Sequence, residues 1–397
     1  MPTYPTYKLG EVADYINGRA FKPSEWKEKG LPIVRIQNLN DENAEYHYSD
    51  VTHEDKYLLH NGDLLFAWAA SLGTYIWNSG DAWLNQHIFK VIPKENVSKK
   101  YLYYALTSII KELYAKSHGS GMVHVTKDKF VNTEIPLPPL PTQHAIVSRI
   151  ESLFAELDKA EEHLRTAQQQ LKIYRQAVLN HWLNNDEGKW EMVKLKDIAD
   201  VNTGSTPKRG NNDYWENGTI PWITSGETNN QHITKASEFI TAKAIAETNC
   251  KIIPKGSLVI AMYGEGKTRG KCAELSIDAA TNQALASITF TNTEISKNFA
   301  KWFFEKNYQD MRLLSSGGVQ PNLNLGIIKN MIIPFPPISE QQRIVAEIES
   351  RLSQAEAVEA SIEKALQQSE ALRQSILKKA FGGELVVSTG STTANCG

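Results

Sequence analysis

Two stretches of the chain decide the fold: IPLPPLPTQHAIVSRIES, residues 135–152, and IPFPPISEQQRIVAEIES, residues 333–350. When the two copies are aligned at an offset of 198 residues, ten of the twenty positions from 135 to 154 carry identical residues. That offset is about half of the 397-residue chain. The sequence therefore predicts a tandem duplication and not a solenoid, because solenoid repeats are much shorter.

The duplication extends through both halves of the chain. Three pairs of segments correspond before the prolines: KLGEVADYINGR from Lys8 with KLKDIADVNTGS from Lys194, GDLLFA from Gly62 with GSLVIA from Gly256, and Asn85-Gln86 with Asn282-Gln283. The offset rises from 186 to 198 along this series and then stays constant, so insertions are confined to the first part of each half. For the two Asn-Gln pairs, a shared structural role at the start of a strand and a contact with DNA bases are both open.

In each half, the pattern of apolar residues changes at the prolines. Before them lie short apolar runs broken by Gly, Asn and Asp, such as DLLFAWAA, HIFKVIP, SLVIAMY and ASITFT, which are typical of strands. KKYLYYALTSIIKELY, residues 99–114, has the spacing of an amphipathic helix. After the prolines the pattern is helical for about forty residues, so each half is expected to be a mixed α/β domain followed by one long helix.

The helical stretches carry apolar residues at alternating spacings of four and three, which is the heptad pattern of a coiled coil. A helix of about forty residues is roughly 60 Å long, and it buries a narrow apolar stripe only against another long helix. The copy in the other half is one such partner, and a second molecule is the alternative. The residues expected to pair the helices are Ile146, Ile150, Leu157, Leu164 and Leu171 in the first copy and Ile344, Ile348, Val358, Ile362, Leu372 and Ile376 in the second.

These patterns predict an α+β protein with a pseudo-two-fold tandem repeat, in which two similar mixed α/β domains are joined by two long antiparallel helices that form a coiled-coil spacer. The expected segments are domain 1 at residues 1–141, helix 1 at 142–184, a linker at 185–191, domain 2 at 192–338, helix 2 at 339–381 and a flexible tail at 382–397. Two similar modules at a fixed separation suit a DNA site whose half-sites lie about one helical turn, ~34 Å, apart.

Composition limits the class of protein. With 41% hydrophobic and 22% charged residues the chain is typical of soluble globular proteins, and no apolar run reaches the roughly 18–20 residues of a membrane helix. The N-terminus shows no secretory pattern, and the three cysteines have no CxxC spacing, so we expect a cytoplasmic protein without a disulfide framework or a zinc site. The net charge of −2 means that DNA contact would need a local basic face or a partner that supplies positive charge.

Several segments resemble the specificity subunits of type I restriction-modification systems. They are the two proline-rich segments that lead into long helices, together with NQHIFKVIP, GSGMVHVTKDKF and AFGGELV, and the resemblance covers about residues 7–386. It implies that each half carries one target recognition domain and that the two helices pack antiparallel. It also implies partners: double-stranded DNA, two modification (methyltransferase) subunits and two restriction (translocase and nuclease) subunits. S-adenosylmethionine, ATP and Mg are then expected on the partner subunits, with no cofactor in this chain.

No catalytic or metal-binding arrangement can be argued from the sequence. The Pro-Pro pairs stand in Leu-Pro-Pro and Phe-Pro-Pro contexts, without the Asn or Asp that an adenine methyltransferase motif needs. AMYGEGKT, residues 261–268, has Ala261 where a phosphate loop requires Gly. We therefore expect a non-catalytic subunit that reads a bipartite DNA target and docks methyltransferase subunits on its helices. A stand-alone bipartite DNA-binding regulator and a coiled-coil scaffold without DNA binding are the alternatives.

The residues expected to contact DNA are inferred from side-chain chemistry alone. Arg pairs with guanine through two hydrogen bonds, Gln and Asn pair with adenine in the same way, and Lys binds phosphate. Basic or amide-rich segments with such side chains occur in both halves. The candidates are Arg35, Gln37, Asn38, His118, Ser120, His124 and Lys127 in the first half and Lys208, Arg209, Thr224, Ser225, Lys267, Arg269, Lys271, Gln320 and Asn322 in the second.

Overall fold

The computed structural model describes residues 4–41, 43–116, 125–185, 187–264, 267–313 and 323–385. It divides into two compact units, of which the first holds Met1–Arg165 with Glu363–Gly397 and the second holds Thr166–Ile362. The division falls within the two long helices, α5 (Leu140–Leu183) and α11 (Ile338–Phe381). Each unit therefore contains one mixed α/β domain and a part of both helices. Within the described ranges, no helix is long and apolar enough to cross a membrane.

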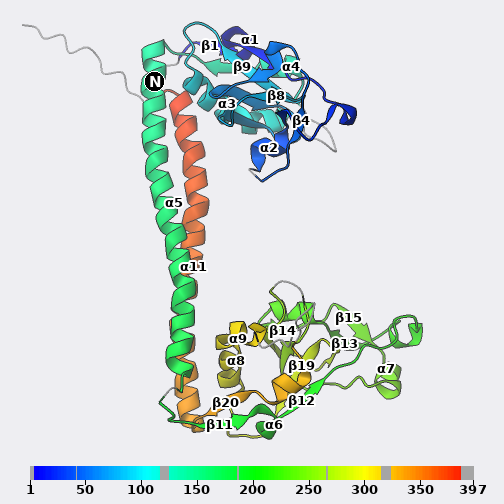
Figure 1. Cartoon of the computed structure of the whole chain (residues 1–397). Helices are drawn as coiled ribbons and strands as arrows, with labels where there is room; N and C mark the ends of the chain where they lie inside the picture. The colour runs from blue at the N-terminus through cyan, green and yellow to red at the C-terminus, as the bar shows by residue number, and fades with distance from the viewer. Residues whose placement is uncertain are drawn as a thin grey trace, which may run out of the picture. The chain divides into compact units, whose positions relative to one another are not determined.

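The mixed domain of the first unit is built on two main sheets (Figure 1). Its strands are β1 (Thr6–Lys8), β2 (Ala13–Asn17), β3 (Leu31–Val34), β4 (His47–Ser49), β5 (Leu58–Leu59), β6 (Asp63–Ala67), β7 (Gly73–Trp77), β8 (Ala82–Leu84), β9 (Ile88–Pro93) and β10 (Glu134–Pro136), and its helices are α1 (Leu9–Val12), η1 (Pro23–Glu25), α2 (Ile36–Asn40), η2 (Asp55–Tyr57), α3 (Lys99–Lys116) and α4 (Lys127–Val131). One sheet has the antiparallel order β2-β9-β6-β7, and the other has the order β4-β3-β8-β5 with β3 and β8 parallel. Strands β1 and β10 pair next to the start of α5.

The mixed domain of the second unit repeats this strand order. Its strands are β11 (Glu191–Lys194), β12 (Ala199–Thr203), β13 (Ile220–Ile223), β14 (His232–Ile233), β15 (Glu238–Ile240), β16 (Leu258–Ala261), β17 (Cys272–Leu275), β18 (Ala280–Thr281), β19 (Leu285–Phe290) and β20 (Ile332–Phe335), and its helices are α6 (Leu195–Ile198), η3 (Asn212–Tyr214), η4 (Ser225–Asn229), α7 (Ala242–Glu247), α8 (Lys297–Lys306), α9 (Tyr308–Leu313) and α10 (Leu325–Lys329). The order β12-β19-β16-β17 matches β2-β9-β6-β7, with β14 added beside β17, and β15-β13-β18 matches β4-β3-β8. The duplication predicted from sequence is therefore a duplication of topology, and the α+β class is confirmed.

A close backbone approach recurs at the same place in both domains. Gly18 follows β2, and a Cβ atom there would lie 2.0 Å from the carbonyl oxygen of Asn85. Gly204 follows β12, and a Cβ atom there would lie 1.9 Å from the carbonyl oxygen of Thr281. No side chain can be accommodated at such distances, so glycine is required at both positions.

The two Asn-Gln pairs share a backbone role at this point. The Asn85 N–H donates to the carbonyl of Val34 at 3.2 Å, and the Asn282 N–H donates to that of Ile223 at 3.0 Å. Each bond joins the end of β3 or β13 to the chain that follows β8 or β18. These bonds therefore extend the parallel pairing of β3 with β8, and of β13 with β18, by one residue.

Each long helix carries a buried glutamine in its first turn. The Gln341 Oε1 accepts a hydrogen bond from the Ser296 N–H at 2.8 Å, while its Nε2 donates to the carbonyls of Glu294 at 2.9 Å and Pro336 at 2.7 Å. Gln143 lies 198 positions earlier and makes the equivalent bonds to the backbone of residues 98, 96 and 138 at 2.8, 3.0 and 2.8 Å. Both side chains are buried. The glutamines therefore fix the start of each long helix to the loop that precedes α3 or α8.

In the first unit, α5 and α11 pack side by side and antiparallel (Figure 1). Ser369 Oγ donates to Glu161 Oε1 at 2.6 Å, and Arg373 Nη2 donates to the same oxygen at 3.1 Å. Arg373 also bonds to Asp158, one turn earlier on α5. Rising residue numbers on α11 thus meet falling numbers on α5, which is the antiparallel order.

The second unit repeats this contact with the roles of the helices exchanged. Arg175 Nη2 of α5 donates to Glu359 Oε2 of α11 at 2.9 Å. Arg175 and Glu359 lie 198 positions from Arg373 and Glu161 of the other unit. Farther along, the guanidinium of Arg351 lies 6.0 Å from the ring centroid of Trp182, so the order is again antiparallel. In both units the helix partner is the other copy within the same chain, as expected.

The predicted pairing residues fall into three groups. Ile146, Ile150, Ile344, Ile348 and Ile362 are buried, and Leu157, Leu164, Leu171 and Ile376 are partly buried. Val358 and Leu372, however, are 49% and 50% exposed, so the prediction that they pair the helices is wrong. The reason is that the position one residue later faces the partner helix instead. There Glu359 and Arg373 make the ion pairs described above.

Each domain packs against the far end of the other copy's helix. In the first unit, Leu377 and Ala380 of α11 are buried with Tyr101 of α3, whose ring lies 5.3 Å from that of Phe381. In the second unit, residues 178, 179 and 183 of α5 are buried with the helices α8 and α11. Burial of these apolar side chains is the main force that holds helix and domain together in each unit.

Candidate nucleic-acid interface

Arg35 stands in the first unit where β3 ends and α2 begins. Its guanidinium carbon lies 5.6 Å from the ring centroid of Trp26. The Trp26 ring in turn stacks on His47 of β4, with centroids 3.7 Å apart and an angle of 8° between the planes. Arg35 Nε is buried and has no hydrogen-bond partner among the described residues. The stacked rings therefore face an arginine that forms no ion pair with any described residue.

The neighbouring histidine does not oppose this cation. Burial, followed by the positive charge of Arg35, holds the pKa of His47 below its usual value. The imidazole is therefore neutral at neutral pH, and the ring stacks on Trp26 without adding a second positive charge. The stack can thus position Arg35 without repelling it.

The other candidates of the first half differ in their surroundings. Gln37 is exposed on α2, and Lys127 is exposed at the start of α4. Asn38 is buried; its Oδ1 accepts from the Arg35 N–H, and its Nδ2 donates to the carbonyls of Ala44 and Glu45 at 3.1 Å each. The expectation that Asn38 contacts a base is therefore wrong, because its amide is used to shape the loop after α2.

Arg209 in the second unit has surroundings that match those of Arg35. Its guanidinium carbon lies 4.0 Å from the ring centroid of Trp215 and 4.9 Å from that of Trp222. Trp215 follows η3 as Trp26 follows η1. Arg209 also forms a bidentate pair with Glu238, and this hydrogen bonding raises the arginine pKa. Lys208, by contrast, is exposed beside it.

The two domains thus present different chemistry at one place. Glu238 is the first residue of β15, and His47 is the first residue of β4, the strand that matches β15. A carboxylate neutralises Arg209, whereas a neutral imidazole ring leaves the charge of Arg35 uncompensated. We therefore expect Arg35 to attract DNA more strongly than Arg209 does.

A basic loop joins β16 to β17 in the second unit. Gly270 in this loop has a φ of +86°, a conformation that favours glycine. Lys271 Nζ donates to Asn229 Oδ1 at 2.8 Å, and this contact joins the loop to the end of η4. Lys267 is exposed, and its carbonyl accepts from the Tyr308 hydroxyl at 2.5 Å. The loop is therefore supported by η4 on one side and by α9 on the other.

The structure adds Arg312 of α9 to this basic loop. Its Nη1 donates to the carbonyl of Arg269 at 3.3 Å and to the Tyr308 hydroxyl at 3.1 Å. Sequence reasoning missed Arg312, although it stands just before SSGGVQPNLN, a segment that contributed Gln320 and Asn322. Lys267, Arg269 and Lys271 of the loop and Arg312 of the helix packed against it therefore bring four basic residues into one region of the second unit.

The remaining candidates serve other roles or cannot be placed. The Thr224 N–H and hydroxyl both donate to Glu227 Oε2, at 2.5 and 3.2 Å, and the Ser225 carbonyl accepts from Thr228. Both residues therefore take part in the turn of η4. His118, Ser120, His124, Gln320 and Asn322 lie outside the described residues.

The part of the chain that the structure describes holds no group of three or more His, Cys, Asp or Glu side chains able to bind a metal ion. Cys272 is buried, and burial raises the pKa of its thiol, which disfavours the nucleophilic thiolate. What the described surfaces do offer is arginine, lysine and amide groups, which bind phosphates and base edges.

The fold is that of a protein with two mixed domains of matching strand order, each followed by one long helix. The chain belongs to the family described as the type I restriction modification DNA specificity domain, whose model matches residues 1–166 and 187–368. It is 28% identical over 413 aligned residues to the EcoBI specificity subunit of Escherichia coli, covering 95% of this chain and 85% of that one. It is 25% identical to the MjaVIII specificity subunit of Methanocaldococcus jannaschii, covering 86% and 84%.

Solved structures share the fold. A chain from a structure of the type I R-M system that describes complex assembly and conformational transition aligns with a TM-score of 0.74 and 19% identity, covering 97% of this chain and 99% of that one. The HsdS subunit from Thermoanaerobacter tengcongensis aligns with a TM-score of 0.58 and 20% identity, covering 96% and 97%. The recognition of the chain as a type I specificity protein is confirmed by these matches.

Proposed function

We propose that the chain is the DNA-reading subunit of a type I restriction-modification complex and recognises a bipartite target. Each mixed domain reads one half-site, and the length of the paired helices sets the number of base pairs between the two. The observation that carries this proposal is the duplication of the whole recognition unit. It extends to strand order and to the ion pairs Arg175–Glu359 and Arg373–Glu161.

The reaction itself belongs to partner subunits in this proposal. Two modification subunits dock on the helices and bring S-adenosylmethionine, and two restriction subunits bring ATP and Mg. The chain itself needs no cofactor and performs no catalysis. Its net charge of −2 supports a role for partners, because additional cations would be needed to neutralise the phosphates of a bound duplex.

In the first half-site, Arg35 is the residue best placed to read a base. A guanidinium held over an aromatic ring keeps its planar donors oriented, and two parallel hydrogen bonds to guanine discriminate against other bases by about 1–3 kcal/mol. In the second half-site, the basic loop of Lys267, Arg269 and Lys271 binds the phosphate backbone or a groove edge.

The test compares the chain alone with the chain bound to its modification subunit. Random-sequence duplexes are methylated in the presence of S-adenosylmethionine, and the methylated fraction is sequenced. The proposal expects two short specified blocks, of which Arg35→Ala relaxes one and leaves the other unchanged. Equally tight sequence-specific binding by the chain alone would favour a stand-alone regulator. If the chain has no affinity for duplex DNA with or without the partner, the result favours the coiled-coil scaffold without DNA binding.

A further inference from the structure

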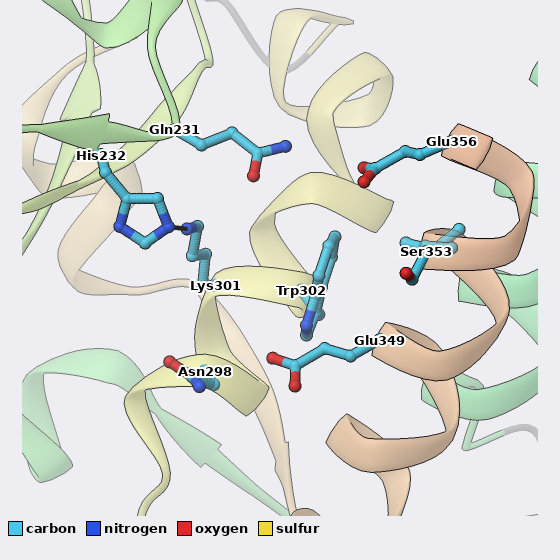
Figure 2. A pocket seen from close by; sticks show the side chains of 9 residues that line it. Gln231, His232, Asn298, Lys301, Trp302, Glu349, Ser353 and Glu356 are labelled. Atoms are coloured by element: carbon cyan, nitrogen blue, oxygen red, sulfur yellow. Dashed lines mark hydrogen bonds between the residues drawn. The ribbon is translucent and has the colours of Figure 1, made fainter. Parts of the chain in front are cut away.

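A polar cavity of about 270 Å³ lies in the second unit between α8, β14 and α11 (Figure 2). One wall carries Lys301 and His232, whose Nζ and Nε2 atoms are 3.2 Å apart. The opposite wall is α11, which presents Glu349 and Glu356. Figure 2 shows Trp302 between these walls, on the side of the Glu349 carboxylate. Neither the recognition residues nor the ion pair of Arg175 uses this cavity.

The Lys301 ammonium on the opposite wall of the cavity contacts His232 and forms no ion pair with either carboxylate. Neither Glu349 nor Glu356 forms an ion pair with any described residue. They are seven residues apart on one helix face, which places them about 10 Å apart along the axis. That separation is too large for both to bind a single metal ion, whose oxygen ligands lie about 2–2.6 Å from it.

The first unit shows what occupies the equivalent place there. Glu151 and Asp158 lie 198 positions before Glu349 and Glu356, and Tyr104 lies 198 positions before Trp302. Lys100 Nζ pairs with Glu151 at 2.7 Å, and Arg373 pairs with Asp158. Glu151 and Asp158 of the first unit are therefore each paired with a cation that the chain itself supplies.

The second unit lacks both of these cations. Asn298 stands where the first unit has Lys100, and its amide carries no charge. Arg175 stands where the first unit has Arg373, but it bonds to Glu359 and is not paired with Glu356. The duplication thus leaves two acidic groups without the cations that the first unit supplies.

We propose that this cavity binds a basic segment of the modification subunit, which presents one cationic side chain to Glu349 and another to Glu356. The side chain at Glu349 also lies against Trp302, because an indole face attracts a guanidinium or an ammonium group. DNA is a poor occupant, since two carboxylates repel phosphate. The proposal rests on the proposed function, which supplies the partner, and adds the place and charge of one contact.

The sharpest test places a cation of the chain itself in the cavity. Asn298→Lys introduces at α8 the cation that Lys100 provides in the first unit, so it should pair with Glu349 without disturbing the fold. In titration calorimetry, we expect the dissociation constant of the full-length variant for the modification subunit to rise by about ten-fold or more. The double variant Glu349→Gln with Glu356→Gln should show the same loss. Glu347→Gln, which changes one charge on the same helix away from the cavity, is the matched control and should bind within about two-fold of the unchanged chain.

Unchanged affinity in both the Asn298→Lys and the double variant, with the same melting temperature, would overturn the proposal. If the unchanged chain itself does not bind the modification subunit, the proposed function fails instead, and the cavity is then tested with a tri-arginine peptide. The NMR signal of the Trp302 indole N–H is assigned with Trp302→Phe. It should shift when the tri-arginine peptide is added to the unchanged full chain, and it should not shift when the peptide is added to the Asn298→Lys variant. Equal shifts in both, or none in either, would refute a cation site.

Discussion

The buried glutamine at the start of α11 allows a quantitative prediction. Replacing Gln341 by alanine removes three hydrogen bonds, to the Ser296 N–H and to the carbonyls of Glu294 and Pro336. At about 1 kcal/mol for each bond, the expected loss of unfolding free energy is about 3 kcal/mol. The better helix propensity of alanine returns only a few tenths of a kcal/mol, roughly, because glutamine is itself a good helix former.

Two measurements on the full chain check this value. Equilibrium urea denaturation gives the loss of unfolding free energy, and hydrogen exchange resolves it at the amide of Ser296. Because about 1.4 kcal/mol corresponds to a factor of ten, a local opening cost lowered by about 3 kcal/mol should speed that exchange on the order of 100-fold. The matched control is Gln342→Ala, since Gln342 is the exposed neighbour on the same turn. A loss below about 1 kcal/mol for Gln341→Ala, or one equal to that of the control, would refute the reasoning.

Four further predictions follow from the described contacts. Ile362→Ala should cost about 2–5 kcal/mol of unfolding free energy in urea titrations, whereas Val358→Ala should change it by less than about 0.5 kcal/mol, because only the first side chain is buried between the helices. Hydrogen bonds from Ser369 and Arg373 lower the pKa of Glu161. This helix contact therefore stabilises the first unit above pH 4.5, and the stabilisation is lost as the pH falls toward the lowered pKa. A Glu161→Gln variant should show a smaller acid-induced drop in melting temperature. Lys267→Ala should weaken DNA binding equally for all sequences and reduce the slope of log affinity against log salt by about 1, whereas a sequence-dependent loss would contradict a phosphate contact. Inserting seven residues into both long helices should lengthen the gap between half-sites by about 3 bp, because about 10 Å of helix is added, and an unchanged gap in methylated DNA would argue against the helices as spacer.

The architecture was predictable because duplication repeats every level of the pattern. The proline segments, the strand runs and the heptads recur in the same order, and a stripe on a long helix requires another long helix. The phase of the helix contact was not predictable from apolar spacing. Glu359 and Arg373 occupy inward positions as ion pairs, so counting apolar residues selected Val358 and Leu372 one residue away.

The recognition surface was predictable only in part, because its side chains are arranged by tertiary contacts. Arg35 follows from chemistry, but the stack of Trp26 on His47 depends on the bridge that pairs Lys27 with Tyr48 of β4, which no local pattern encodes. Asn38 has the side chain of a base-reading residue, yet its amide donates to two carbonyls of the loop that follows α2. Local sequence does not reveal such a contact.

The most direct test of the account is methylation mapping across the genome of a strain that carries this chain with its modification subunit. The account predicts one motif made of two short specified blocks at a fixed spacing, with Arg35→Ala altering one block only. A single contiguous motif, or a variant that alters both blocks together, would contradict the assignment of one half-site to each domain.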